Sequence, residues 1–426
     1  MKHSVEEVHL RSGAKGLLIN VPGASVMSTR IHFRGGLRYA KKPELYEIAH
    51  VVEHLSFGAN SKYKSEASYE ADFTKNGAYH NAWTSDLSIC YETECADFEW
   101  DRILELKKLA LCEPKFLETE LKSEKGNVKS ELTGYTNDYN RLLWPRLQQS
   151  IGEDVKNLPE RIKTVQNIKI KDIKEHYKNT HTAKNMRFVI AGNLGFRRRR
   201  KISKLLNNWN LKTGELLKVP TDSLCSNPPV LIRRKDAANI TFGFSFVIPY
   251  RLDSACIIAM NCLDHILNGT MSSKIFGEAR KRGLVYNMGS SVNLDESKSS
   301  WDFDGEVDEE NALELFSLIR QELKKVSKGD ISEKDIESAK SYCLGRFQMG
   351  AQTVSQIADF YAESYFKSDE IENYSKIPDI IRTVDKTEIV ELAREFLNSD
   401  IHALVAVSSC EKALINDLAR QIDLRN

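Results

Sequence analysis

The chain has 426 residues, 41% of them apolar and 28% charged, so it is long enough for two or three domains with hydrophobic cores. Its formal net charge of +1 excludes a strongly basic nucleic-acid-binding protein or a protein that docks on membranes through a polybasic surface. No segment approaches the roughly 20 apolar residues of a membrane span. The first 16 residues lack an apolar signal core and contain two glutamates, so we expect a cytoplasmic protein.

The N-terminal half mixes strand-like and helix-like patterns without regular alternation of the two. Alternating apolar and polar residues predict strands, and apolar residues at helical spacing predict helices. Strands and long helices combined in this way are typical of an α+β sandwich, in which helices cover a mixed sheet. The predicted elements are strands 13–21 and 26–33, helix 47–58, strand 82–95, helices 99–112, 116–138 and 169–180, and strand 187–192.

The predicted helix 47–58 contains the order His-x-x-Glu-His, known as the inverzincin motif. His50 and His54 are four residues apart, so on a helix they project from one face as two ligands of a single zinc ion require. Glu53 lies beside them, where its carboxylate can take a proton from water activated by the metal. The motif indicates a zinc metallopeptidase.

A pattern this short also arises by chance, so its surroundings matter. The other positions of the helix, including Val51, Val52 and Leu55, are apolar, and His50, Glu53 and His54 form the polar patch on this segment. Burying three ionisable groups without partners would cost several kcal/mol. A bound metal ion is the simplest way to satisfy them.

The third zinc ligand is expected on the predicted helix 116–138, because catalytic zinc usually has three protein ligands and one open position. Glu124 and Glu131 are two turns apart and share one face of this helix. Either could reach the metal while the other supports it, and spacing alone does not rank them. The candidates are Glu118, Glu120, Glu124 and Glu131.

The C-terminal half repeats the element order of the first. Residues 211–229 break the periodicity and end in Pro-Pro, as an interdomain linker does. We therefore predict a domain at 1–212, a linker at 213–229 and a second domain of similar topology at 230–426. The expected elements of the second domain are strand 239–249, helix 255–267, strands 285–294 and 299–307, long helices and a closing strand 402–409.

Several motifs resemble those of the pitrilysin/insulinase family of zinc peptidases, particularly its two-domain members of the mitochondrial-processing-peptidase and bacterial type. The similarity runs nearly from end to end, so coincidence is a poor explanation. It rests on FRGGLRY (33–39), EIAHVVEHLSFGAN (47–60), GAYHNAWTSDLSICYE (77–92), KNMRFVIAGN (184–193) and MSSKIFGEARKRGLVYNMGSS (271–291).

The resemblance implies a complete zinc site. In the family the third ligand follows the second His after about 76 residues, and Glu131 stands 76 residues beyond His54. The resemblance thus implies one zinc ion per subunit on His50, His54 and Glu131, with Glu53 as the general base. It implies that Glu124 supports catalysis without binding zinc directly, as a group that orients a ligand does.

The resemblance also implies how substrate is held. An extended peptide would add by backbone hydrogen bonds to an edge strand, although the same segment could be an interior strand. The residues of this strand are His80, Asn81, Ala82 and Trp83.

The second domain is expected to supply a tyrosine and an arginine that hold the substrate backbone or the oxyanion. Tyr286 matches the family's tyrosine. The arginine usually precedes it by seven residues, where this chain has Ala279, so Arg280 fills the role only if the loop is one residue shorter. Arg282 belongs to the Arg-Gly-Leu step and is expected to pack elsewhere.

The implied function is zinc-dependent hydrolysis of internal peptide bonds in unfolded peptides, inside a chamber of which this chain forms half. Full-length relatives have four such domains, so this chain is expected to form a homodimer or a heterodimer with a homologous subunit. One alternative is a dedicated processing protease for one peptide precursor. Others are a non-catalytic core subunit of the same fold and a binding module with structural zinc, although a structural site usually has four protein ligands.

Overall fold

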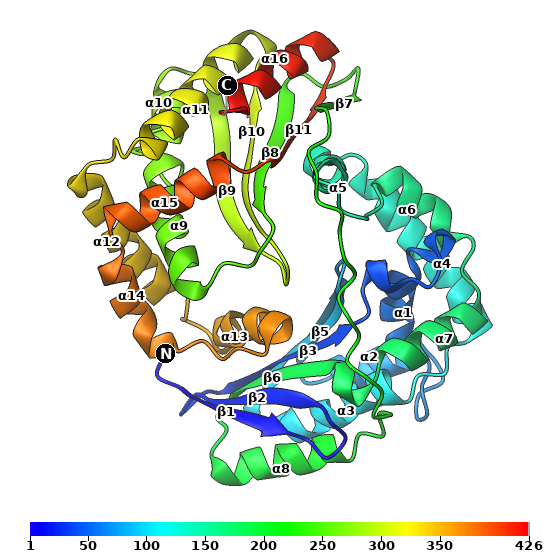
Figure 1. Ribbon diagram of the computed structural model, residues 1–426. Helices are drawn as coiled ribbons and strands as arrows, with labels where there is room; N and C mark the ends of the chain where they lie inside the picture. Colours follow the sequence, from blue (N-terminus) through cyan, green and yellow to red (C-terminus); the bar gives the residue numbers. More distant parts are fainter. Residues whose placement is uncertain (425–426) are drawn as a thin grey trace. The chain divides into compact units, whose positions relative to one another are not determined.

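The computed structural model describes residues 1–424, which form two compact units (Figure 1). Neither unit is continuous along the chain. Unit 1 comprises Met1–Gly134, Pro159–Pro220 and Gly350–Glu372. Unit 2 comprises Tyr135–Leu158, Thr221–Met349 and the residues from Asn373 onward. None of the helices within residues 1–424 combines the length and the apolar character needed to cross a membrane.

Unit 1 contains a six-stranded mixed sheet in the order β1-β2-β6-β3-β5-β4. β2 and β6 run parallel, and the other neighbours are antiparallel. Every residue of β6 is buried, as expected for a central strand that is covered on both faces. β4 is the edge strand beyond β5. The strands are β1 (Ser4–His9), β2 (Lys15–Asn20), β3 (Val26–Arg34), β4 (Tyr79–Thr84), β5 (Ser88–Ala96) and β6 (Met186–Gly192).

The segment predicted as one strand, 82–95, is in fact part of a hairpin of β4 and β5, so that prediction was wrong. The Ser85 amide donates to the Ser88 carbonyl at 2.8 Å, and this bond closes a tight turn between the strands. Ser and Asp favour turns because their side chains bond to nearby backbone. The turn makes β4 a separate strand with an open edge.

Helices cover both faces of the unit 1 sheet. On one face, Tyr91 of β5 bonds through its hydroxyl to Ser56 at the end of α1. The opposite face packs against α13. The helices of unit 1 are α1 (Ile48–Ser56), α2 (Glu66–Thr74), α3 (Trp100–Cys112), α4 (Glu118–Tyr135), α6 (Leu158–Val165), α7 (Ile170–Thr180), α8 (Phe196–Asn207) and α13 (Val354–Ser368).

Unit 2 contains a five-stranded sheet in the order β7-β11-β8-β10-β9, which corresponds strand for strand to β2-β6-β3-β5-β4 of unit 1. β7 and β11 are parallel, as β2 and β6 are. The predicted fold class, α+β with two similar sheets covered by helices, is confirmed. The strands are β7 (Val230–Arg233), β8 (Ile240–Ile248), β9 (Val285–Leu294), β10 (Ser299–Val307) and β11 (Ile401–Ser408).

The two faces of the unit 2 sheet differ in side-chain size. Phe244 of β8 stacks on Phe303 of β10 in the core, with ring centroids 4.6 Å apart. The other face carries small residues, and at Gly243 an added Cβ would lie 2.4 Å from a methyl group of Leu143. The missing side chain therefore lets α5 pack closely on β8. The helices of unit 2 are α5 (Tyr139–Ser150), α9 (Ser254–Leu267), α10 (Phe276–Lys281), α11 (Ala312–Ser327), α12 (Glu333–Met349), α14 (Ile377–Thr383), α15 (Lys386–Leu397) and α16 (Lys412–Ile422).

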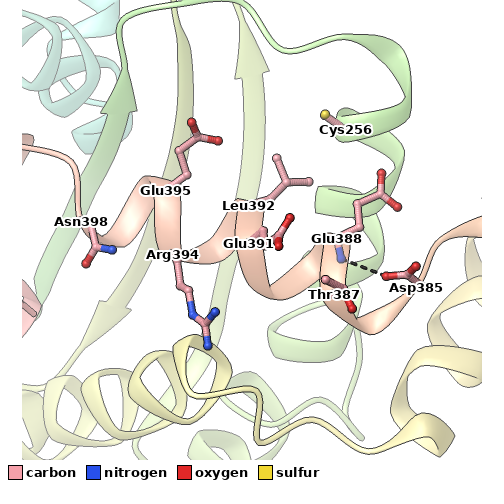
Figure 2. A pocket seen from close by; sticks show the side chains of 9 residues that line it. All are labelled: Cys256, Asp385, Thr387, Glu388, Glu391, Leu392, Arg394, Glu395 and Asn398. Atoms are coloured by element: carbon pink, nitrogen blue, oxygen red, sulfur yellow. Dashed lines mark hydrogen bonds between the residues drawn. The ribbon is translucent and has the colours of Figure 1, made fainter.

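A hollow of about 720 Å³ follows α15 in unit 2 (Figure 2). Its acidic side chains Asp385, Glu391 and Glu395 are exposed on the helix. Asp385 caps α15 by accepting the Glu388 amide at 2.9 Å, as Asp commonly does at a helix N-terminus. This hollow is a solvated helix surface.

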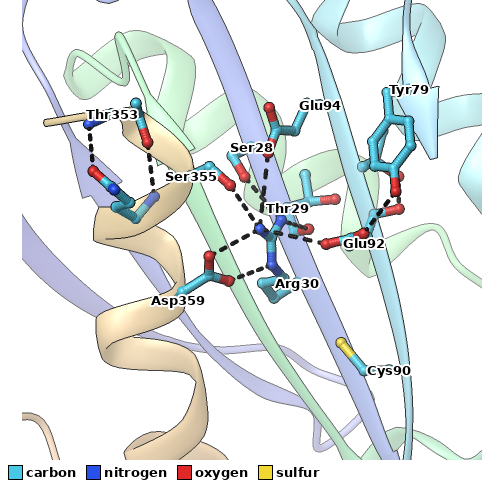
Figure 3. Close-up of polar contacts among 12 residues, drawn as sticks. Ser28, Thr29, Arg30, Tyr79, Cys90, Glu92, Glu94, Thr353, Ser355 and Asp359 are labelled. Atoms are coloured by element: carbon cyan, nitrogen blue, oxygen red, sulfur yellow. Dashed lines mark hydrogen bonds and ion pairs between the residues drawn. The ribbon is translucent and has the colours of Figure 1, made fainter. Parts of the chain in front are cut away.

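A buried arginine fixes α13 on the unit 1 sheet. Arg30 of β3 is 3% exposed, and its guanidinium donates to Asp359 at 2.6 Å and to Ser355 at 2.7 Å, both on α13 (Figure 3). Glu92 of β5 lies 3.5 Å from the same guanidinium. A buried guanidinium without such partners would be strongly unfavourable, so these contacts determine where α13 packs.

The compact units and the halves of the chain are different divisions. α5 belongs to unit 2 because it packs on β8 and β11, and α13 belongs to unit 1 because it packs on β3 and β6. Residues 210–229 contain no helix or strand. The division into 1–212, 213–229 and 230–426 remains a prediction about order along the chain.

Candidate metal centre

Helix α1 carries the motif on a segment that the core holds firmly. Val51 and Val52 are fully buried, and Leu55 is 1% exposed. His50 and Glu53 are also buried, so the polar side of the helix does not simply face water. Buried polar groups need partners, and those of α1 come from three other elements.

His50, His54 and Glu131 converge on one point. The Nε2 atoms of His50 and His54 lie 3.4 Å and 3.6 Å from Oε2 of Glu131, which is on α4. One ligand atom from each residue lies within 4.8 Å of the other two. Two ligands that each lie about 2.0–2.1 Å from a tetrahedral zinc ion are about 3.3 Å apart. The nitrogen and oxygen donors, and their spacing, fit a zinc ion.

Two further carboxylates orient the imidazoles. His50 Nδ1 lies 3.0 Å from Oε2 of Glu47, and His54 Nδ1 lies 2.9 Å from Oε2 of Glu124. When each Nδ1 donates its proton to a carboxylate, the Nε2 lone pair faces the converging point and is available to a metal. Glu47 is held in turn by Arg161 of α6, at 3.2 Å.

The charges around the imidazoles favour a cation. Burial alone would lower the pKa of His50, but hydrogen bonds to Glu131 and Glu47 outweigh it and raise the pKa to about 9. At His54, burial is likewise outweighed by hydrogen bonds to Glu124 and Glu131, which raise the pKa to about 10. The carboxylates therefore keep positive charge in this site, as protons or as a metal ion.

Comparison with known proteins identifies the family. The family model described as insulinase (peptidase family M16) matches residues 17–156, and the model described as peptidase M16 inactive domain matches residues 167–343. The chain belongs to the insulinase family, peptidase family M16.

Insulinase-family relatives span nearly the whole chain. An uncharacterized zinc protease of Bacillus subtilis, YmxG, is 20% identical over 405 residues, which cover 93% of this chain and 97% of that protein. A protease structure from Helicobacter pylori superposes with a TM-score of 0.80 at 18% identity, covering 95% of this chain and 99% of that one. A peptidase M16 inactive domain from Pseudomonas fluorescens gives a TM-score of 0.82 at 15% identity, covering 96% and 98%. The solved structures establish similarity of fold.

In this insulinase-family chain the carboxylate of Glu53 is oriented by the edge strand. Oε2 of Glu53 accepts a hydrogen bond of 2.6 Å from the Thr84 hydroxyl at the end of β4. Burial raises the pKa of Glu53, while the neighbouring His50 and the Thr84 hydroxyl oppose that rise. A carboxylate with a raised pKa is a better proton acceptor, as a general base needs to be.

The predicted substrate strand is the edge strand β4. Asn81 and Trp83 are exposed, whereas His80 and Ala82 are half-buried toward α1 and α2. The His80 imidazole bonds to Glu70 of α2 at 2.5 Å and packs against Phe73, so its side chain is held within unit 1. The role of the strand in binding peptides stays a prediction.

Arg280 and Tyr286 lie together in unit 2. Nη1 of Arg280 donates to the Tyr286 carbonyl at 2.6 Å, and its guanidinium carbon is 4.3 Å from the centre of the Tyr286 ring. The tyrosine is 82% exposed. Arg282 instead pairs with Glu278 within α10 and its C-cap, at 2.8 Å.

Three residues of the metal centre were not predicted from sequence. Glu47 was open to prediction, because it precedes His50 by three residues and so lies on the same helix face. Thr84 continues the period-two pattern of His80 and Ala82, although nothing in that pattern indicates a contact with Glu53. Arg161 lies in α6, which the sequence analysis did not anticipate.

Proposed function

We propose that this protein is a zinc-dependent endopeptidase that cleaves unfolded peptides. The observation that carries the proposal is the convergence of His50, His54 and Glu131 beside Glu53, whose carboxylate is buried and oriented by Thr84. Membership of a peptidase family and the similarity to a zinc protease support it. The main alternative, a non-catalytic subunit, would not need this complete set of side chains.

The proposed zinc site consists of His50, His54 and Glu131. When bound there, zinc supplies Lewis acidity, which polarises a peptide carbonyl and makes water a stronger acid. Glu47 and Glu124 hold the imidazoles so that each presents Nε2. Glu53 accepts a proton from the attacking water on its carboxylate and later passes it to the nitrogen of the leaving amine.

The substrate is proposed to lie along β4. The free edge of this strand offers backbone N–H and C=O groups to an extended peptide. Thr84 ends the strand, and its hydroxyl contacts Glu53, so a peptide paired with β4 would pass close to the base. Backbone pairing accepts many sequences, which suits the cleavage of diverse unfolded peptides.

The test compares metal content with turnover. Purified protein should contain about one zinc ion per chain by elemental analysis, and it should cleave members of a mixed peptide library. Chelation should abolish cleavage, and added zinc should restore it. Glu53→Gln should retain zinc and lose cleavage. Zinc-loaded wild-type protein without activity on any peptide would favour the non-catalytic alternative, and full activity of Glu53→Gln would refute the role of that residue.

We also propose that two chains assemble and share their sites. Each chain carries both a zinc motif and the Arg280–Tyr286 pair. If a site uses groups from two chains, mixing inactive Glu53→Gln with inactive Tyr286→Phe should restore part of the activity. No recovery after mixing and subunit exchange, or an active monomer by light scattering, would contradict this assembly.

A further inference from the structure

A cavity of about 430 Å³ lies in unit 2 between α10, β9, β10 and the start of α5 (Figure 1). Two carboxylates line it, those of Asp304 and Glu306 on β10. Its walls include the rings of Phe276 and Tyr286. It therefore combines negative charge with apolar and aromatic surface.

The carboxylates reach this cavity because side chains alternate along β10. Phe303 points into the aromatic core, so Asp304 and Glu306 point to the face on which α5 packs. Asp304 stands opposite Gly243 on β8 and Gly289 on β9. Neither neighbour has a side chain, so the adjacent strands offer Asp304 no side-chain partner.

Asp302, two residues earlier on the same strand face, behaves differently. It accepts hydrogen bonds from Ser245, from Asn293 at 2.8 Å and from Ser300 at 2.8 Å. No residue in the described range 1–424 forms a hydrogen bond or an ion pair with the carboxylate of Asp304 or Glu306. Asp302 is thus a satisfied structural residue, and the next two acidic residues are not.

Arg280 also lines the cavity, yet it does not neutralise these carboxylates. Its guanidinium is engaged by the carbonyl and the ring of Tyr286. Burial, and the nearby charge of Asp302, raise the pKa of Asp304, so its ionised form is unfavourable in the folded protein. An acidic residue retained at such a cost indicates a role in binding a cation.

We propose that this cavity binds a basic side chain, arginine or lysine, of a peptide substrate, with Asp304 and Glu306 as specificity-determining residues. The aliphatic stem of the guest packs against Phe276, its charged group faces the carboxylates, and the exposed Tyr286 ring can cover it. The identity of the occupant as a peptide rests on the proposed function. The acidic hollow along α15 is a poorer candidate because its carboxylates are exposed on one helix without an aromatic wall among the residues that line it (Figure 2).

The test measures binding separately from cleavage. Full-length Glu53→Gln protein is titrated into two fluorescent, unstructured peptides that differ only by Arg or Gln at one position, scanned along the peptide. At the position that occupies the cavity, the Arg peptide should bind roughly 3- to 10-fold more tightly. Adding Asp304→Asn and Glu306→Gln should bring this ratio close to one.

A matched control comes from the same unit. Glu310→Gln removes an exposed carboxylate outside the cavity and should leave the Arg/Gln ratio unchanged. An equal loss in this control would mean that general charge attraction, and not the cavity, selects the peptide. Thermal melting of each variant shows that it is folded, and Asp304→Asn should melt no lower than its parent because it removes an unfavourable charge.

The outcomes separate this inference from the proposed function. A preference for Arg that depends on Asp304 and Glu306 supports the cavity even if zinc-loaded wild-type protein cleaves neither peptide, a result that would refute only the peptidase proposal. Cleavage of both peptides with equal kcat/KM, together with equal binding at every scanned position, would overturn the cavity and leave the peptidase proposal intact.

Discussion

The Thr84 hydroxyl donates a hydrogen bond of 2.6 Å to the Glu53 carboxylate and so joins the edge strand β4 to helix α1. The bond links the element proposed to bind the peptide to the group proposed to move the proton. Because α1 and β4 belong to the same unit, the relationship is internal to unit 1. Thr84 is therefore a positioning residue for the proposed base.

Replacing Thr84 by valine should lower kcat roughly 10-fold while zinc content stays at one per chain. Valine keeps the shape of threonine but cannot donate, so the Glu53 carboxylate loses its orientation. Steady-state kinetics on one fluorogenic peptide would measure the effect.

Thr84→Ser supplies the control for this prediction, because it restores a hydroxyl and should recover most of kcat. If valine and serine variants had the same kcat, the hydrogen bond would have no catalytic role. A loss of zinc in the valine variant would indicate instead that the substitution disturbs α1.

Glu47→Gln and Glu124→Gln should each weaken zinc binding by roughly 10- to 100-fold. Each carboxylate holds the Nδ1 proton of one ligand, His50 or His54, and a neutral amide does so less strongly. Competition with a zinc chelator of known affinity measures the change. Glu118→Gln, an exposed position on the same α4 helix, should bind zinc as the wild type does.

The zinc ligands were open to prediction because their spacing is local. His50 and His54 lie on one helix, where a separation of four residues fixes their relative direction. Glu131 could not be chosen over Glu124 by the same reasoning, since both lie on one face of α4. Only the family resemblance separated them, and in the structure Glu131 meets both Nε2 atoms while Glu124 meets Nδ1 of His54.

The parts that sequence reasoning missed depend on contacts between distant segments. Arg161 supports Glu47 from 114 residues away, and no local pattern indicates such a pair. The exchange of α5 and α13 between the two halves is a further example. Equivalent sheets were expected from the repeated element order, but the helix that covers a sheet face is decided by packing, as at Gly243 and Arg30.

Asp359→Asn should lower the free energy of unfolding by roughly 1–3 kcal/mol. Asp359 neutralises the buried guanidinium of Arg30, and the amide would leave that charge poorly compensated. Half of the Asp359 side chain is exposed, so water can replace part of the lost interaction. Denaturation in urea measures the change, and Asp379→Asn, at an exposed aspartate on α14, is the control. Equal stability of the Asp359 variant and the wild type would show that the ion pair does not hold α13.

Acid should destabilise the protein through buried neutral histidines. Burial, and then the charge of Arg30, lower the pKa of His32 to about 4, and burial lowers the pKa of His176 to about 4. In the unfolded chain these groups titrate near pH 6.5. Between those values the unfolded state binds protons that the folded state does not, so stability falls as the pH drops from about 6.5 to about 4, by about 1.4 kcal/mol per pH unit for each histidine.

His32→Phe isolates one of these contributions. The His32 ring stacks on Phe366 with centroids 4.9 Å apart, and within the described residues its buried Nδ1 has no hydrogen-bond partner, so phenylalanine can replace it. The variant should lose stability less steeply than the wild type between pH 6.5 and pH 4, in urea unfolding followed on metal-free protein. His50 and His54 have raised pKa values and favour the folded state at low pH, but they are present in both proteins and cancel in the comparison. Identical slopes would mean that His32 is protonated in the folded protein, against the burial that the structure gives it.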